Sequence, residues 1–168
     1  MSAFLSRLRG GAALPPVPPA RVIALSGLGG FLAIAVVAGL AEGLSQALVL
    51  GSFGASCVLV FGFPDVPFSQ PRNVVFGHVL SSFTGLACLA VFGPHWWAAA
   101  VAVALAIMGM MALRCVHPPA GSNPVIVFLA TPGWAFLLTP TLAGALVLVA
   151  VALVYNNLRG PGRYPAYW

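Results

Sequence analysis

The chain has 168 residues, of which 61% are hydrophobic and only 5% carry charge, and this composition excludes a water-soluble globular domain. The formal net charge of +5 comes from seven arginines against two acids, Glu42 and Asp65. Because the arginines are scattered between apolar runs, they indicate membrane topology and argue against a nucleic-acid partner. The cysteines also lie in apolar sequence, where we expect buried thiols and neither a disulfide nor a metal site: they are Cys57, Cys88 and Cys115.

Six apolar segments follow a proline-rich arm. Residues 1–20 contain two arginines and the run Leu-Pro-Pro-Val-Pro-Pro, which predicts an extended cytoplasmic arm. Residues 21–157 form the expected transmembrane domain of an all-α protein, and residues 158–168 form a cytoplasmic tail. Each segment approaches the roughly 20 residues that cross a bilayer. The segments are 22–40, 44–63, 73–92, 96–113, 114–132 and 135–154.

Two topologies compete. In one, all six segments cross the membrane, and in the other, segments two and five are re-entrant and only four segments cross. With the N-terminus in the cytoplasm, six crossings place every arginine on the cytoplasmic side and Glu42 outside. Four crossings put Arg72 and Arg114 on the opposite face from the rest. The rule that arginine accumulates on the cytoplasmic side therefore favours six crossings, with both termini in the cytoplasm.

Segments two and five share a motif. Residues 54–61, Gly-Ala-Ser-Cys-Val-Leu-Val-Phe, align without gaps with residues 121–128, Gly-Ser-Asn-Pro-Val-Ile-Val-Phe, although such a match can also recur by chance in so apolar a sequence. Each copy lies in the middle of a three-segment unit. The two units, residues 21–93 and 94–157, would therefore be inverted relative to each other. Inverted repeats with broken helices at corresponding positions point to a transporter's binding site near the membrane midplane.

Each copy of the motif predicts an extended approach followed by a half-helix. Ser56 and Asn123 are residue types that favour the N-cap, and Pro124 is favoured at the first helical position. We therefore predict half-helices over 57–63 and 124–130, with N-termini that face each other near the centre of the membrane. Helix N-termini carry partial positive charge and free N–H donors, so this pair would attract a small anion without a buried lysine or arginine.

Three stretches resemble the HPP family of integral membrane proteins. They are Cys-Val-His-Pro-Pro-Ala-Gly-Ser-Asn-Pro at 115–124, Gly-Ser-Phe-Gly-Ala-Ser at 51–56, and Gln-Pro-Arg-Asn at 70–73 followed by Gly77-His78. The family takes its name from the triplet seen here as His117-Pro118-Pro119, and the resemblance covers about residues 20–157. It implies a small transporter-like protein, with members in cyanobacteria and chloroplasts linked to nitrite transport. Members are commonly described with four spans, and Ser122-Asn123 departs from the Ala-Thr or Ala-Ser expected after the glycine.

The residues expected to bind the anion come from both broken segments. They are Ser52, Gly54, Ala55, Ser56, Cys57, His117, Gly121, Ser122 and Asn123. The hydroxyl and amide side chains can donate hydrogen bonds to an oxyanion or cap their helices, and His117 can contact substrate, carry a proton or tie the broken backbone. His78, inside the third segment, is a candidate for a proton relay. Arg72 and Arg114 either mark topology or line a cytoplasmic vestibule that concentrates anions.

The leading functional hypothesis is a channel or secondary transporter for a small inorganic anion in a bacterial inner membrane, with nitrite suggested by the family resemblance. No cofactor and no enzymatic activity are expected. A metal-dependent intramembrane enzyme that uses His78, His95 and His117 is an alternative, but no His-x-x-x-His or Glu-x-x-His spacing supports it. A sensory or scaffolding membrane module is a third reading. Glycines that suit close helix packing would serve contacts within one chain or in a homo-oligomer.

Overall fold

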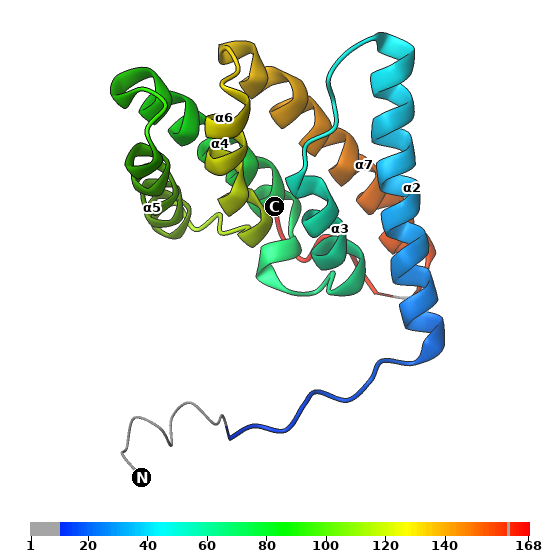
Figure 1. Cartoon of the computed structure of the whole chain (residues 1–168). Helices are drawn as coiled ribbons and strands as arrows, with labels where there is room; N and C mark the ends of the chain where they lie inside the picture. The colour runs from blue at the N-terminus through cyan, green and yellow to red at the C-terminus, as the bar shows by residue number, and fades with distance from the viewer. Residues whose placement is uncertain (1–10, 161) are drawn as a thin grey trace.

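The computed structural model describes residues 11–160 and 162–168. Within this range every regular element is helical, as Figure 1 shows, which confirms the all-α prediction. The first half of the proline-rich arm lies outside the described residues. The second half, 11–19, is exposed and without helix, and Pro19 has φ −55° and ψ 142°, the extended polyproline conformation that the sequence predicts.

The described residues form six α-helices. The α-helices are α2 (Ala20–Leu44), α3 (Ser52–Gly62), α4 (Pro71–Phe92), α5 (Trp96–Ala112), α6 (Asn123–Ala130) and α7 (Ala143–Leu158). Short turns of tighter or wider helix lie in the connections between α3 and α4, α5 and α6, and α6 and α7. Three helical stretches of the described chain are long and apolar enough to cross a membrane, and these are Ala20–Leu44, Pro71–Phe92 and Trp134–Leu158. Helices α3, α5 and α6 are shorter. The count of six crossings therefore stays a prediction.

Segments two and five are both interrupted, but their helices begin earlier than the sequence predicts. Helix α3 begins at Ser52, after the N-cap residue Gly51, and the prediction of Ser56 as its N-cap is wrong. The physical reason is that the Ser56 hydroxyl lies 3.2 Å from the Ser52 carbonyl one turn earlier and within hydrogen-bond distance of two buried histidines, so its polar group has partners in the helix interior. Helix α6 begins one residue early, at Asn123, so its N-cap is Ser122 and the prediction of Asn123 as the N-cap is also wrong, while Pro124 stays in the first turn.

The sixth segment is also less regular than predicted. Instead of one helix over 135–154, a short turn over Trp134–Leu137 and a wider turn over Leu138–Leu142 precede α7. Thr139 has φ −133° and ψ 122°, which is extended backbone, and Pro140 follows it. A proline removes a backbone donor and disfavours helical geometry in the preceding residue, so the helix can become regular only after this point.

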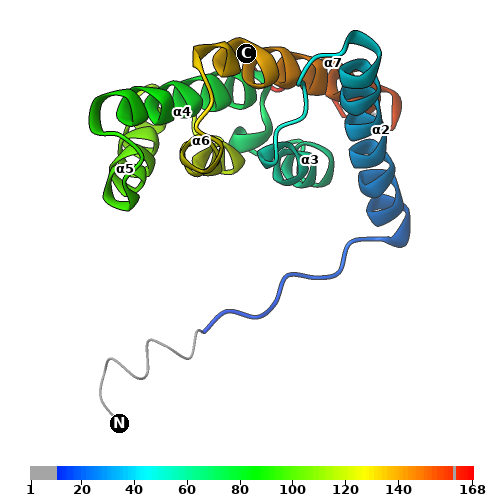
Figure 2. The same ribbon diagram turned by 45° about the horizontal axis from the view of Figure 1, so that its top comes forward.

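Helix α4 contacts both broken segments, packing along α6 and touching α3 through the ring of His78. Helices α5 and α6 pack against α4, while α2, α3 and α7 pack against one another (Figures 1 and 2). Two glycines of α4 allow this approach. A Cβ atom on Gly77 would lie 2.8 Å from Cβ of His117, and one on Gly85 would lie 2.9 Å from Cα of Pro124. The backbone of segment five therefore lies directly against α4.

The described arginines gather at one end of the helices. Arg21 begins α2, and Arg159 follows α7, and both line one cavity beside the loop between α3 and α4. Arg72, in the first turn of α4, donates to the backbone carbonyls of Leu113 and Arg114 at 3.1 and 2.7 Å, which ties the end of α5 to the same region. This grouping is the one that the six-crossing topology requires, and its relation to a membrane stays a prediction.

Candidate functional site

The two broken helices begin against each other inside the protein. The hydroxyl of Ser52, the first residue of α3, donates to Oδ1 of Asn123, the first residue of α6, across 2.7 Å. Both side chains are buried, with 3% and 0% of their surface exposed. In Figure 1 the two short helices lie near the centre of the molecule and run away from each other. The structure therefore brings together two positions that lie 71 residues apart in the sequence.

Two buried histidines flank Ser56 beside this meeting point. The Ser56 Oγ lies 2.9 Å from Nε2 of His78 and 2.8 Å from Nε2 of His117, so one hydroxyl joins both imidazoles. The ring centroids of the two histidines are 5.0 Å apart. All three side chains are fully buried. The ring of Phe53 packs edge-on against His78 with centroids 5.1 Å apart, which fixes the plane of that imidazole.

The hydrogen-bond partners determine which ring nitrogen carries each proton. The Asn123 amide nitrogen lies 3.2 Å from the backbone oxygen of His78, which can only accept, so this atom is the NH₂ donor. The same NH₂ lies 3.0 Å from Nδ1 of His78, which must therefore accept and leave the proton on Nε2. At the other end, Nδ1 of His117 lies 2.7 Å from the carbonyl oxygen of Phe68, so Nδ1 of His117 carries a proton and donates.

The result is a directed chain of hydrogen bonds between two neutral imidazoles. The Nε2–H group of His78 donates to Ser56, the Ser56 hydroxyl donates to Nε2 of His117, and Nδ1–H of His117 donates to Phe68. In the reverse direction, Nδ1 of His78 would carry a proton that faces the Asn123 NH₂ group, so two donors would oppose each other. Nδ1 of His117 would carry no proton and would face the Phe68 carbonyl, so two acceptors would oppose each other. An added proton on Nε2 of His117 is also accommodated, because the Ser56 hydroxyl can turn to the Ser52 carbonyl at 3.2 Å.

Sequence reasoning missed three polar side chains around this site. The Asn123 amide also donates to Ser82 at 2.9 Å, and Thr141 donates to the same hydroxyl at 3.0 Å. Ser81 donates to the Ala120 carbonyl at 2.6 Å and so anchors the proline-rich turn before α6. Ser81 and Ser82 follow His78 by three and four residues, which places them on the same helix face and could have revealed them. No sequence signal points to Thr141.

Several of the predicted binding residues lie away from the meeting point. Gly54 and Ala55 are exposed on the outer side of α3, and Cys57 packs against Gly30 of α2, with its Cβ 3.6 Å from the position of an added Gly30 Cβ. Gly121 is half-buried, and the Ser122 hydroxyl is exposed and donates to the Pro119 carbonyl within its own turn.

The two arginines of the predicted vestibule lie at the end of α5. Arg72 holds the backbone there, and Arg114, at the same place, is exposed.

The histidines of the metal-dependent alternative do not all come together. His78 and His117 are neighbours, but His95 stacks on Trp97 in the turn before α5, with ring centroids 5.8 Å apart and planes 9° apart. Across the described chain, no three His, Cys, Asp or Glu side chains are close enough to hold one metal ion. All three cysteines are buried and free, as the sequence predicts.

Comparison with known proteins agrees with the helical, apolar character of the chain. A family model described as HPP, transmembrane region, matches residues 15–165. A transmembrane protein of Dictyostelium discoideum is 36% identical in an alignment that covers 92% of this chain and 58% of that protein. A second transmembrane protein of the same organism is 33% identical in an alignment that covers 98% of this chain and 57% of the relative. The chain thus spans less than two thirds of these relatives. No solved structure matches it.

Proposed function

The chain belongs to the HPP family of transmembrane proteins, and from that premise we propose that it transports a small inorganic anion, with nitrite as the first candidate. The observation that carries the proposal is the hydrogen bond between Ser52 and Asn123, which joins the first residues of two broken helices inside the protein. In transporters built from discontinuous helices, the substrate site lies where such helices begin. We also propose a bacterial inner membrane as the location, with both termini in the cytoplasm.

The chemistry of the meeting point favours an anion. Helix N-termini carry partial positive charge, and two such ends converge here. The Ser52 and Ser56 hydroxyls and the Asn123 amide add side-chain donors. In the described conformation these donors are paired with one another, so an entering oxyanion would take the place of the bond between Ser52 and Asn123. Polar side chains within a transmembrane protein are costly and usually functional, which supports a transport role for this cluster.

The histidine pair supports a proton as the accompanying ion. Both imidazoles are neutral in the observed hydrogen-bond arrangement, so an anion bound beside them would have no formal countercharge. A proton added at Nε2 of His117 would supply that charge next to the starts of both helices, and Ser56 can turn to accommodate it. We therefore propose that the anion and the proton move together.

Anion flux into proteoliposomes tests the proposal. We expect uptake of nitrite at a pH slightly above neutrality, faster than in protein-free vesicles, which control for permeation by nitrous acid. An inward proton gradient should accelerate the uptake. Asn123→Leu, which removes the amide from the cluster, should abolish uptake, while Ser122→Ala, which alters an exposed hydroxyl, should retain it. If nitrite, nitrate, formate and chloride all fail to enter vesicles that contain folded protein, the proposal is wrong.

A further inference from the structure

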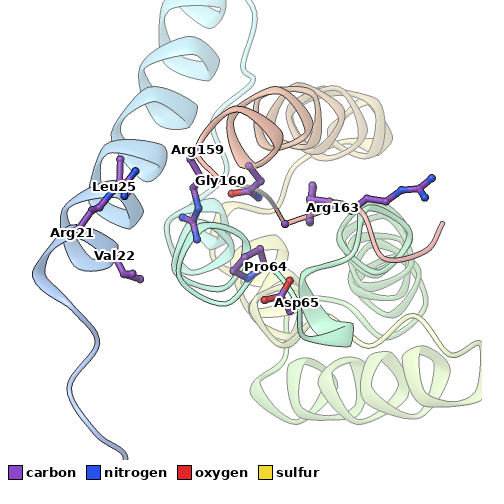
Figure 3. A pocket seen from close by; sticks show the side chains of 11 residues that line it. Arg21, Val22, Leu25, Pro64, Asp65, Arg159, Gly160 and Arg163 are labelled. Carbon is purple, nitrogen blue, oxygen red and sulfur yellow. The ribbon is translucent and has the colours of Figure 1, made fainter.

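A second polar site lies at the arginine-rich end of the molecule, and its lining shares no residue with the cluster at the starts of α3 and α6. A cavity of about 340 Å³ opens between the first turn of α2, the loop after α3 and the end of α7 (Figure 3). This volume falls within the range of small-ligand sites, roughly 300–1,000 Å³. Three arginines line it, namely Arg21, Arg159 and Arg163, against one acid, Asp65. The lining thus has a formal excess of two positive charges.

The side chains around this cavity offer both donors and acceptors. In Figure 3 the Arg159 side chain points toward Pro64 and Asp65, while Arg163 extends outward from the rim. Arg159 is held in place because one of its NH₂ groups donates to the Phe61 carbonyl at 2.6 Å. Asn156 also lines the cavity, and it is 95% buried. Its amide nitrogen donates to the Val60 carbonyl at 3.1 Å, but its Oδ1 has no hydrogen-bond partner among the described residues.

Oδ1 of Asn156 is itself buried away from the cavity surface, so the side-chain acceptor that the cavity offers beside its arginines is Asp65. Arginine recognises phosphate through several N–H groups at once. A ligand that matches both features carries a negative phosphate and, close to it, hydroxyl groups that can donate.

An apolar groove leads away from this cavity between α2 and α3. Its nearer part is lined by Ser26 and Phe63. Ser26 lies one helical turn after Val22, and Phe63 directly precedes Pro64, and both Val22 and Pro64 line the cavity. Its farther part continues along Gly30 and Cys57, which line both parts, toward Ala38 and Gly54. Four glycines line the groove, namely Gly27, Gly30, Gly54 and Gly62, and Gly27 has no atom within 4 Å of an added Cβ. An acyl chain fits such a surface in a transmembrane protein.

We propose that this cavity and groove bind an anionic phospholipid, with the phosphate beside Arg21 and Arg159, a headgroup hydroxyl on Asp65, and one acyl chain along the groove between α2 and α3. The phosphodiester balances part of the excess positive charge, and the hydroxyl donates to the carboxylate. Free phosphate could use the arginines alone, but it would leave the groove unused. The proposal does not depend on the transport of an anion at the starts of α3 and α6.

Lipid titration of delipidated protein in a mild detergent tests the site, with binding read by native mass spectrometry and by the shift in melting temperature. We expect phosphatidylglycerol to bind and to raise the melting temperature, while phosphatidylcholine and inorganic phosphate do neither at the same concentration. Equal binding of phosphatidylcholine would refute recognition of charge and hydroxyls. Full competition by inorganic phosphate would show that the cavity takes the free ion, and the lipid proposal would then be wrong.

Two variants locate the binding. Arg21→Gln should weaken phosphatidylglycerol binding about tenfold, the loss expected for one charge-assisted contact. Gly27→Leu should weaken it as well, because the new side chain occupies the groove, and its Cβ has no atom within 4 Å. Arg114→Gln is the matched control, since Arg114 is exposed at the same end of the molecule but does not line the cavity. Equal loss of binding in Arg114→Gln would mean that general charge attracts the lipid, which would overturn the site.

Discussion

Replacement of Ser56 by alanine gives the sharpest test of the buried polar cluster. The Ser56 hydroxyl accepts from Nε2 of His78 at 2.9 Å and donates to Nε2 of His117 at 2.8 Å. Its removal leaves one buried N–H without an acceptor and one buried ring nitrogen without a donor. Neither ring can relieve this loss by moving its proton, because Asn123 and the Phe68 carbonyl fix the protonation of the opposite nitrogens.

The expected loss follows from these two groups. Each buried polar atom left without a partner costs about 1–3 kcal/mol, so Ser56→Ala should lower the free energy of unfolding by about 2–6 kcal/mol. The measurement is unfolding of the purified protein in mixed micelles, titrated with a denaturing detergent and followed by tryptophan fluorescence. The same variant should lose proton-accelerated nitrite uptake, because the connection between the two imidazoles is broken.

Ser122→Ala is the control for this experiment. Its hydroxyl is exposed and donates only to the Pro119 carbonyl at 2.8 Å, so the change in unfolding free energy should stay within about 0.5 kcal/mol. If Ser56→Ala unfolds at the same detergent fraction as the unmodified protein, the two imidazoles do not depend on the hydroxyl. The directed chain of hydrogen bonds would then be refuted.

Two further predictions concern packing and the C-terminal tail. Gly85→Ala should destabilise the protein by about 1–3 kcal/mol in the same titration, because the added Cβ would lie 2.9 Å from Cα of Pro124, whereas Gly54→Ala, with no atom within 4 Å, should not. Burial raises the pKa of the Tyr164 phenol, which donates to the Ser69 carbonyl at 2.7 Å. The contribution of this phenol to the free energy of unfolding is complete at a pH below 10.0, the ordinary pKa of tyrosine. It falls as the pH rises above 10.0, because the phenol then loses its proton in the unfolded chain but keeps it in the folded protein. Melting temperatures across this range should fall less in Tyr164→Phe, and equal slopes would contradict the prediction.

The sequence predicted that segments two and five are interrupted, but it did not predict the residues at which their helices begin. Prolines and glycines in 114–124 exclude regular helix, and the repeated motif pointed to a matching interruption before α3. The exact starts were not predictable, because Ser56 suits an N-cap in isolation and becomes a helix-interior residue only when its hydroxyl bonds within α3 and to two histidines. Gly54 and Ala55 show the same limit, since the alignment placed them at the site while the helix turns them outward.

The sequence by itself determined the class of the protein. A chain that is 61% hydrophobic and only 5% charged has more apolar surface than a water-soluble domain of this size can bury, so it must be a membrane protein. The sequence also determined that two segments are interrupted, since proline removes backbone donors wherever it occurs. Only the tertiary structure decided which polar groups meet. The bond from Ser52 to Asn123 and the contribution of Thr141 join residues from distant parts of the chain, and no local pattern encodes a contact that packing against α4 creates.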